Sequence, residues 1–199
     1  MDTLKAEKRD LSTKAKKLRR EGYVTGNIIG REIEGSIPIQ MEAREAERIL
    51  KTKKKGGQLY LDVEGQQMDV LIKEIHYNAA LKRYDEVDFQ ALVSTEKVHS
   101  VAEVILLNHE KVQNGIVQTV LSEIAYKALP SALVETIEIN VENMKPGDTV
   151  KVGDLPIASD PNVELTTRKD AVVVLSAEPN ISAADAEAAA EEAADEKAK

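Results

Sequence analysis

Short runs in which apolar and polar residues alternate, separated by turn-forming residues, constrain the fold of this chain more than any other feature. In SIPIQM, Ile37, Ile39 and Met41 occupy every second position, and the run VETIEINV at residues 134–141 repeats the pattern. A period of two is typical of a β-strand with one buried face. At 199 residues the chain is long enough for one or two domains, so we expect a mainly β protein with some α structure.

The first half of the chain is predicted to form a small α+β domain built on a sheet or a partly closed barrel. Two strands flank the turn EGQQ as a hairpin, and EAREAERILK at residues 42–51 is predicted to be an amphipathic helix. We expect the run RYDEVDFQALV to supply the closing strand. The predicted strands of this half are residues 24–30, 36–41, 58–63, 68–75 and 83–93.

The second half is predicted to be an all-β sandwich or barrel. The runs VAEVILL at residues 101–107 and AVVVLSA at residues 171–177 join VETIEINV as strands, and Pro146-Gly147 marks a turn. From Ser182 onward the chain contains only small and charged residues, which leaves nothing to bury. We therefore expect a barrel-like domain at residues 1–93, a C-terminal all-β domain at residues 94–179, and a disordered Ala/Glu tail at residues 180–199.

The charge of the chain is unevenly distributed. The net charge is −8, but residues 1–94 carry 18 basic against 16 acidic side chains, and residues 95–199 carry 9 against 19. Because a local basic patch can set the encounter with a polyanion even in an acidic protein, the basic clusters of the first half are the main functional clue.

The segment KAKKLRREG is predicted to be a short helix with a cationic surface. Leu11, Ala15 and Leu18 have the spacing of one buried helical face, Ser12 or Thr13 could cap the start, and Gly22 could end it. A second basic run, KTKKKGG at residues 51–57, would suit contact with the backbone of the same ligand if it lies on the same face. The alternative for both runs is a solvated surface that only keeps the domain soluble.

Several function classes find no support in the sequence. The chain has no Cys, no phosphate-binding Gly-rich loop, no segment with the features of a signal peptide, and no apolar run long enough to span a membrane. Its histidines, at positions 76, 99 and 109, do not have the spacing of metal ligands. We expect a cytoplasmic protein that is not an enzyme, although a catalytic site without a familiar motif is a third alternative.

The order of motifs resembles a known family. LKAEKR, KKLRREG, PIQM, VLIKEI and EVDF in the first half, and VQTVLSEIAYKALPSALVETIEINVENMKPGDTVKVGDLP in the second, are similar to the bacterial large-subunit ribosomal protein that binds 5S rRNA, in its long form called the general stress protein Ctc. The likeness runs from about Leu4 to Pro179. It implies an RNA-binding barrel-like domain, a C-terminal β domain, and a place on the central protuberance of the ribosome.

The resemblance also implies which residues contact RNA. Mg²⁺ would enter only with the bound RNA, and no other cofactor, membrane or DNA is expected. The implied RNA-binding positions are Arg9, Lys16, Lys17, Arg19, Arg20, His76, Glu86 and Asp88.

The chain departs from the family pattern at five places: Leu11-Ser12-Thr13, Val24-Thr25-Gly26, Ile29, His76 and Glu86. At the last, a carboxylate replaces an imidazole and adds repulsion toward RNA unless Arg19, Arg20 or a bound cation neutralises it. We therefore expect binding that is weaker or more dependent on magnesium than is usual for the family.

Two hypotheses follow. The first is a structural component of the 50S subunit that binds 5S rRNA; the acidic half would then face neighbouring ribosomal proteins or solvent, because its charge repels RNA. The second is a diverged family member that has left the ribosome and acts as a stress-linked protein-interaction module.

Overall fold

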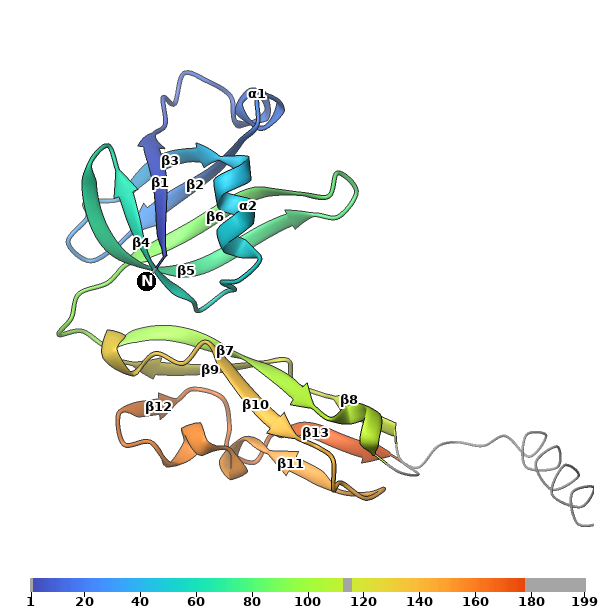
Figure 1. Ribbon diagram of the computed structural model, residues 1–199. Helices are drawn as coiled ribbons and strands as arrows, with labels where there is room; N and C mark the ends of the chain where they lie inside the picture. The colour runs from blue at the N-terminus through green and yellow to red at the C-terminus, as the bar shows by residue number, and fades with distance from the viewer. Residues whose placement is uncertain (1, 113–115, 178–199) are drawn as a thin grey trace, which may run out of the picture.

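The computed structural model describes residues 2–112 and 116–177, which form two β units that follow one another along the chain (Figure 1). The expected class, mainly β with some α structure, is confirmed. The tail expected at residues 180–199 lies outside the described residues.

The first unit is a closed barrel with the strand order β1-β3-β2-β6-β5-β4. β1 pairs in parallel with β4, and the strand expected at residues 83–93 is β6, the last barrel strand along the chain, which joins β5 to β2. The strands are β1 Thr3–Lys8, β2 Tyr23–Ile29, β3 Ser36–Glu42, β4 Gln58–Val63, β5 Gln66–Asn78 and β6 Arg83–Ala91.

Alternation along the strands fills the barrel. On β6, Val87 and Phe89 are fully buried. Glu86, which precedes Val87, and Asp88, which lies between the two buried residues, therefore point to the outer face. The β4–β5 hairpin turns at Glu64 and Gly65, both with positive φ, as a tight two-residue turn requires. The predicted hairpin is thereby confirmed.

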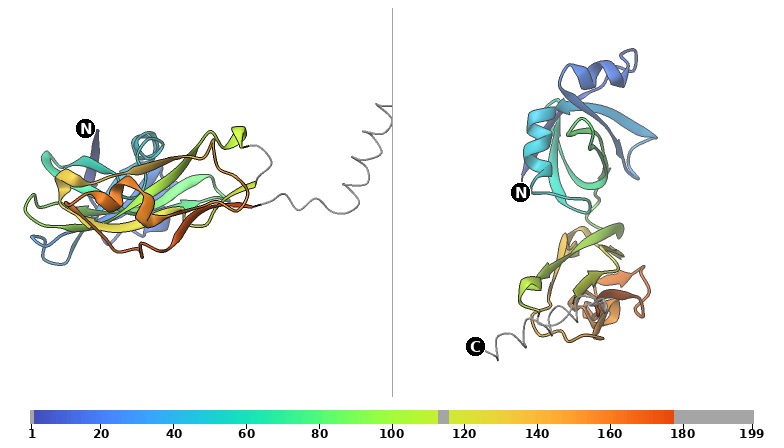
Figure 2. Two further views of the ribbon diagram at one scale, coloured as in Figure 1. Left: turned by 90° about the horizontal axis from the view of Figure 1, so that it is seen from below. Right: turned by 90° about the vertical axis from the view of Figure 1, so that its right-hand side faces the viewer.

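Two helices accompany the barrel. Helix α2, Ala43–Leu50, buries Ala46, Ile49 and Leu50 against it, close to the predicted helix at residues 42–51. Helix α1, Ala15–Arg20, lies at one end of the barrel (Figures 1 and 2).

The expected start of α1 is wrong. The cap position is Lys14, without a side-chain cap, while Ser12 hydrogen-bonds Asp10 in the preceding turn. Leu11 is 73% exposed, so of the three residues predicted to form the apolar face only Leu18 is buried. The predicted end is correct, because the chain turns at Gly22 with a φ of 91°.

The second unit packs two sheets over one core. One sheet has the order β10-β7-β9-β12 and the other β11-β13-β8. The strands are β7 Val98–Leu107, β8 Ile116–Thr119, β9 Glu123–Ala128, β10 Thr136–Asn140, β11 Thr149–Lys151, β12 Val163–Leu165 and β13 Val172–Ala177. Short 3-10 turns connect them at η1 His109–Lys111, η2 Pro130–Ala132, η3 Val152–Asp154 and η4 Pro156–Ser159.

Tyr126 is the largest fully buried side chain of this core. Its hydroxyl donates to the carbonyl of Val134 at 2.8 Å and accepts from the amide of Val134 at 2.7 Å. Burial raises the pKa of this hydroxyl, against the hydrogen bond with Val134 that lowers it. The pair fixes the connection that leads into β10.

Candidate nucleic-acid interface

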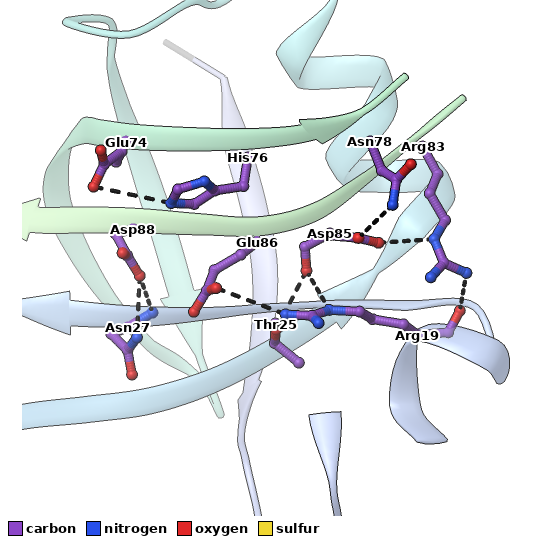
Figure 3. A network of polar contacts seen from close by, with 10 residues as sticks. All are labelled: Arg19, Thr25, Asn27, Glu74, His76, Asn78, Arg83, Asp85, Glu86 and Asp88. Carbon is purple, nitrogen blue, oxygen red and sulfur yellow. Dashed lines mark hydrogen bonds and ion pairs between the residues drawn. The ribbon is translucent and has the colours of Figure 1, made fainter. Parts of the chain in front are cut away.

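Arg19 fastens α1 to the barrel. Its Nε donates to the carbonyl of Asp85 at 2.9 Å, and its Nη2 donates to Oγ1 of Thr25 at 3.2 Å (Figure 3). The same nitrogen lies 3.6 Å from the carboxylate of Glu86. Arg19 therefore supplies the neutralisation that the carboxylate at position 86 needs.

Asp85 is the centre of the adjoining network. Its carboxylate accepts from Nδ2 of Asn78 at 3.0 Å and from Nε of Arg83 at 2.8 Å (Figure 3). Arg83 in turn donates to the carbonyl of Arg19 at 3.2 Å. The hydrogen bond from Asn78, supported by the charges of Arg83 and Arg19, lowers the pKa of Asp85. The network joins the end of α1 to the stem of the β5–β6 hairpin.

Three of the predicted site residues share the outer face of β5 and β6. His76 is the ladder partner of Glu86, and its Nε2 lies 4.0 Å from the carboxylate of Glu74. Asp88 accepts from the backbone amide of Asn27 at 3.0 Å and from its Nδ2 at 3.1 Å (Figure 3). The face therefore offers a row of polar groups, held by one another, beside α1.

The remaining predicted residues divide into positioning groups and free cations. Arg9 turns inward and donates to the carbonyl of Thr13 at 3.1 Å, which braces the segment before α1. Lys17 lies 3.8 Å from Glu21 in a solvent-exposed pair. Lys16 and Arg20 are exposed and have no ion-pair or hydrogen-bond partner within residues 2–112 and 116–177.

The second basic run does not extend this surface. Lys53 contacts Glu135, Lys54 contacts Glu103 at 2.6 Å, and Lys55 contacts Glu123 at 3.1 Å, all across the junction with the second unit. The expectation that this run would suit the same ligand as α1 is therefore not met. The expectation that the acidic half faces only solvent or other proteins is likewise wrong for these glutamates. We name the six residues the junction lock.

The lock fits a row of carboxylates on the second unit. Glu103 and Glu123 are ladder partners on β7 and β9, and the amide of Glu103 bonds the carbonyl of Glu135. Neighbouring carboxylates repel one another, so an adjacent row of lysines relieves that repulsion. Gly56, with a φ of 84°, lets the run approach closely: a Cβ there would lie 2.1 Å from the carbonyl oxygen of Val101.

Comparison with known proteins decides the family. Residues 4–89 match the Ribosomal L25p family, and residues 97–180 match the C-terminal domain of ribosomal protein TL5. A protein of Akkermansia muciniphila named large ribosomal subunit protein bL25 is 33% identical over 98% of each chain. The chain belongs to the ribosomal L25p family.

Two other relatives carry the same name. The protein of Carboxydothermus hydrogenoformans is 31% identical over 82% of this chain and 81% of its own, and that of Bacillus licheniformis is 28% identical over 80% and 78%. The L25p family consists of structural proteins and not of enzymes, in agreement with the sequence-based expectation.

No group of three or more His, Asp or Glu side chains among residues 2–112 and 116–177 is placed to hold a metal ion. In the same part of the chain, no helix has both the length and the apolar character needed to cross a membrane.

The sequence did not reveal the residues that hold the site together. Thr25, Asn27, Arg83 and Asp85 anchor the predicted residues but were not themselves predicted. The predicted hairpin was β4–β5, whereas the pairing of β5 with β6, which places His76 opposite Glu86, was not predicted. No sequence pattern points to the contacts of Arg19, whose partner Asp85 lies 66 positions away.

Proposed function

We propose that this protein is a structural constituent of the large ribosomal subunit and that its first unit binds 5S rRNA. It would then act in the cytoplasm, bound to the ribosome, with neighbouring ribosomal proteins of the central protuberance as further partners. Membership of the ribosomal L25p family supports the first part. The second part rests on the exposed, unpaired cations of α1 beside the polar outer face of the barrel.

The single observation that carries the proposal is that the cations of α1 have two different roles: one binds the barrel, and others face solvent. The guanidinium of Arg19 forms hydrogen bonds with residues of the barrel, and these bonds fix α1 in one orientation. Lys16 and Arg20 are then presented to solvent from a rigid support. Cations fixed in place bind phosphate with a smaller loss of conformational entropy than cations on a mobile tail.

The polar face would set the register on the RNA. Folded RNA is recognised through its shape, its phosphates and its 2′-hydroxyl groups, which donate and accept hydrogen bonds. Asp88 can accept such bonds, His76 can accept or donate them, and Glu86 is tolerated because Arg19 neutralises it. In this arrangement Arg9 acts as a positioning residue, while Lys16, Lys17 and Arg20 contact phosphates.

A salt titration of binding to isolated 5S rRNA tests the proposal. Lys16→Gln and Arg20→Gln should each reduce the slope of log affinity against log salt by about one, because each removes one phosphate contact. Arg44→Gln on α2 is the matched control, since Arg44 is also an exposed helical arginine. The control should leave the slope unchanged.

Glu86→His tests the altered face. It should tighten binding and reduce its requirement for Mg²⁺, because it removes a carboxylate that faces the RNA. If the wild-type protein shows no preference for 5S rRNA over an unrelated folded RNA, and Glu86→His creates none, the proposed RNA function is wrong.

The rival hypothesis, a stress-linked interaction module that has left the ribosome, makes the opposite prediction in a lysate. A ribosomal constituent sediments with 50S particles through sucrose at low salt, whereas such a module stays at the top of the gradient. The three relatives named above are large-subunit proteins, so they do not favour the rival.

A further inference from the structure

The junction between the two units holds a cleft of about 430 Å³ with a cationic lining. The barrel contributes Arg31, from the loop after β2, and Lys73 of β5; the second unit contributes Lys97 and Lys127. Glu96 is the one acidic residue of this lining. Such an excess of positive charge is unexpected where the acidic half of the chain begins.

The sheet of the second unit separates its charges along one ladder. Lys127 on β9 is the partner of His99 on β7, and Glu123 is the partner of Glu103 four residues further along the same pair of strands. The acidic end of the ladder is occupied by the junction lock, and the basic end lines the cleft. The lock therefore neutralises carboxylates of the junction that would otherwise repel a polyanion.

The cations of the cleft are only partly compensated. Arg31 pairs with Glu96 at 2.8 Å, and Lys97 lies 3.7 Å from Glu164 in an exposed pair. Lys127 makes no ion pair within the described residues, although Glu164, the partner of Lys97, stands opposite it in the β9–β12 ladder.

Lys73 contributes a half-buried cation to the lining of the cleft. Its Nζ donates to the carbonyl of His99 at 3.0 Å and has no carboxylate partner among the described residues. Burial, and then the nearby charge of Lys55, lower the pKa of Lys73. A group whose charged form is disfavoured in this way gains from an added anion.

The cleft continues the outer face of the barrel. Val87 and Phe89 of β6 point inward, so Glu86, Asp88 and Gln90 follow one another along the outer side of the strand. Gln90 itself lines the cleft. A ligand lying along the polar face of β6 would therefore reach the cationic lining.

We propose that this junction cleft binds the phosphodiester backbone of RNA, as a second contact separate from α1. The lining offers three lysines, one arginine and the exposed imidazole of His99, with no Phe, Tyr or Trp, and this cationic set suits phosphates. The inference rests on the proposed function in one respect, namely that the ligand is ribosomal RNA. The strand can belong to 5S rRNA or to other RNA of the same subunit.

The full-length double variant Lys97→Gln/Lys127→Gln tests the cleft. Both residues belong to the second unit, and Arg31, Lys73 and the junction lock remain in place. Lys111→Gln/Lys145→Gln makes the same change of net charge elsewhere in the second unit and serves as the control. Equal melting temperatures for the three proteins show that the variants are folded.

Affinity is measured against salt with two ligands: isolated 5S rRNA, and 50S particles from which the protein has been stripped. The cleft variant should lower the slope by about two with at least one ligand, and the control should not. A loss with 5S rRNA identifies 5S rRNA as the source of the strand. A loss with the particles alone identifies other RNA of the subunit.

If the cleft variant leaves the salt slope unchanged with both ligands, the cleft does not bind RNA. An equal fall of the slope in the control variant would also contradict the proposal, because it would reflect net charge alone. The proposed function is judged separately by Arg20→Gln on α1. If that substitution still weakens binding while the cleft variant does not, the cleft inference fails and the 5S rRNA proposal stands.

Discussion

The two basic runs of the first unit resemble each other in sequence but differ in what their side chains contact. Helix α1 leaves Lys16 and Arg20 free in solvent, whereas each lysine at positions 53, 54 and 55 meets a glutamate of the second unit. The difference shows that the function of a cationic run depends on which carboxylates the fold brings to it. Charge density alone would give both runs the same role.

The junction lock also gives the acidic half a structural role. A row of three neighbouring carboxylates would be unfavourable on a free sheet, and the barrel supplies one lysine for each. Exposed ion pairs contribute little individually, but Gly56 adds a close backbone contact at the same place. Together they hold the junction cleft in shape.

The largest expected effect separates the two runs by RNA affinity. Lys16→Gln/Lys17→Gln/Arg20→Gln should lower the salt slope with 5S rRNA by about three, which corresponds to a loss of about three orders of magnitude in affinity at 0.1 M salt relative to 1 M. Lys53→Gln and Lys54→Gln, each tested alone so that the other pairs hold the junction, should leave the slope unchanged. A reduced slope in either single variant would mean that the lock lysines contact RNA.

The second prediction compares the glycines that follow the two runs. Gly22→Ala should cost about 1 kcal/mol, because alanine disfavours the positive φ but its Cβ meets nothing within 4 Å. Gly56→Ala should cost about 2 kcal/mol more, because its Cβ would clash with the carbonyl oxygen of Val101. Urea unfolding followed by circular dichroism measures both.

Limited proteolysis supplies a second measurement for the same pair of variants. If Gly56 holds the two units together, Gly56→Ala should speed cleavage in the linker between β6 and β7, and Gly22→Ala should not. Equal cleavage rates would show that the close approach at Gly56 does not govern the junction.

Periodicity predicted most of the barrel but little of the site. Strands with a clear alternation, such as β3 and β4, were found from the sequence, while β1 was missed because charged residues surround the buried Leu4 and Ala6. In the second unit β9 was also missed, although Ile124, Tyr126 and Ala128 alternate as buried residues. Lys127 fits the outward positions of this alternation, but the small apolar Ala125 stands at another of them, so the two faces of this short strand contrast weakly in sequence.

The sequence could not predict which cations form ion pairs, for a physical reason. An ion pair depends on distance in space, and Lys53 and Glu135 are 82 positions apart in the chain. Neither residue carries a local pattern that distinguishes it from its neighbours. Only the closure of the barrel and the placement of the second unit determine that the second run is neutralised and the first is not.

The third prediction addresses the difference between adjacent arginines of α1. Arg19→Ala should lower the free energy of unfolding by about 2 kcal/mol, because it leaves the carbonyl of Asp85 and the carboxylate of Glu86 without their cationic partner. Arg20→Ala should change stability by less than about 0.5 kcal/mol, since Arg20 is exposed and makes no side-chain hydrogen bond or ion pair in the described residues. Urea unfolding of the two variants checks this, and similar losses in both would contradict the two different roles.

The smallest expected effect concerns the pH dependence of the α1 anchor. The hydrogen bond from Asn78, with the charges of Arg83 and Arg19, lowers the pKa of Asp85 from its ordinary value of 3.8. A carboxylate with a lowered pKa in the folded state stabilises the protein above the unfolded pKa and loses this contribution as the pH falls through the folded pKa. The anchor should therefore be insensitive to pH above about 5.

Asp85→Asn isolates this contribution, because the amide keeps an acceptor oxygen but carries no charge. The stability difference between the wild-type protein and Asp85→Asn should be constant above about pH 5. It should shrink as the pH falls below 3.8, because the carboxyl of the unfolded chain binds a proton first and that of the folded protein follows at its lower pKa. Asp10→Asn is a useful contrast: the pKa of Asp10 is also lowered, by hydrogen bonds from Ser12, but this pair lies in an exposed turn before α1. A pH dependence as large for Asp10 as for Asp85 would show that the network around Arg19 stabilises α1 no more than the exposed turn before it does. The proposal that α1 presents its cations to RNA from a rigid support would then be wrong.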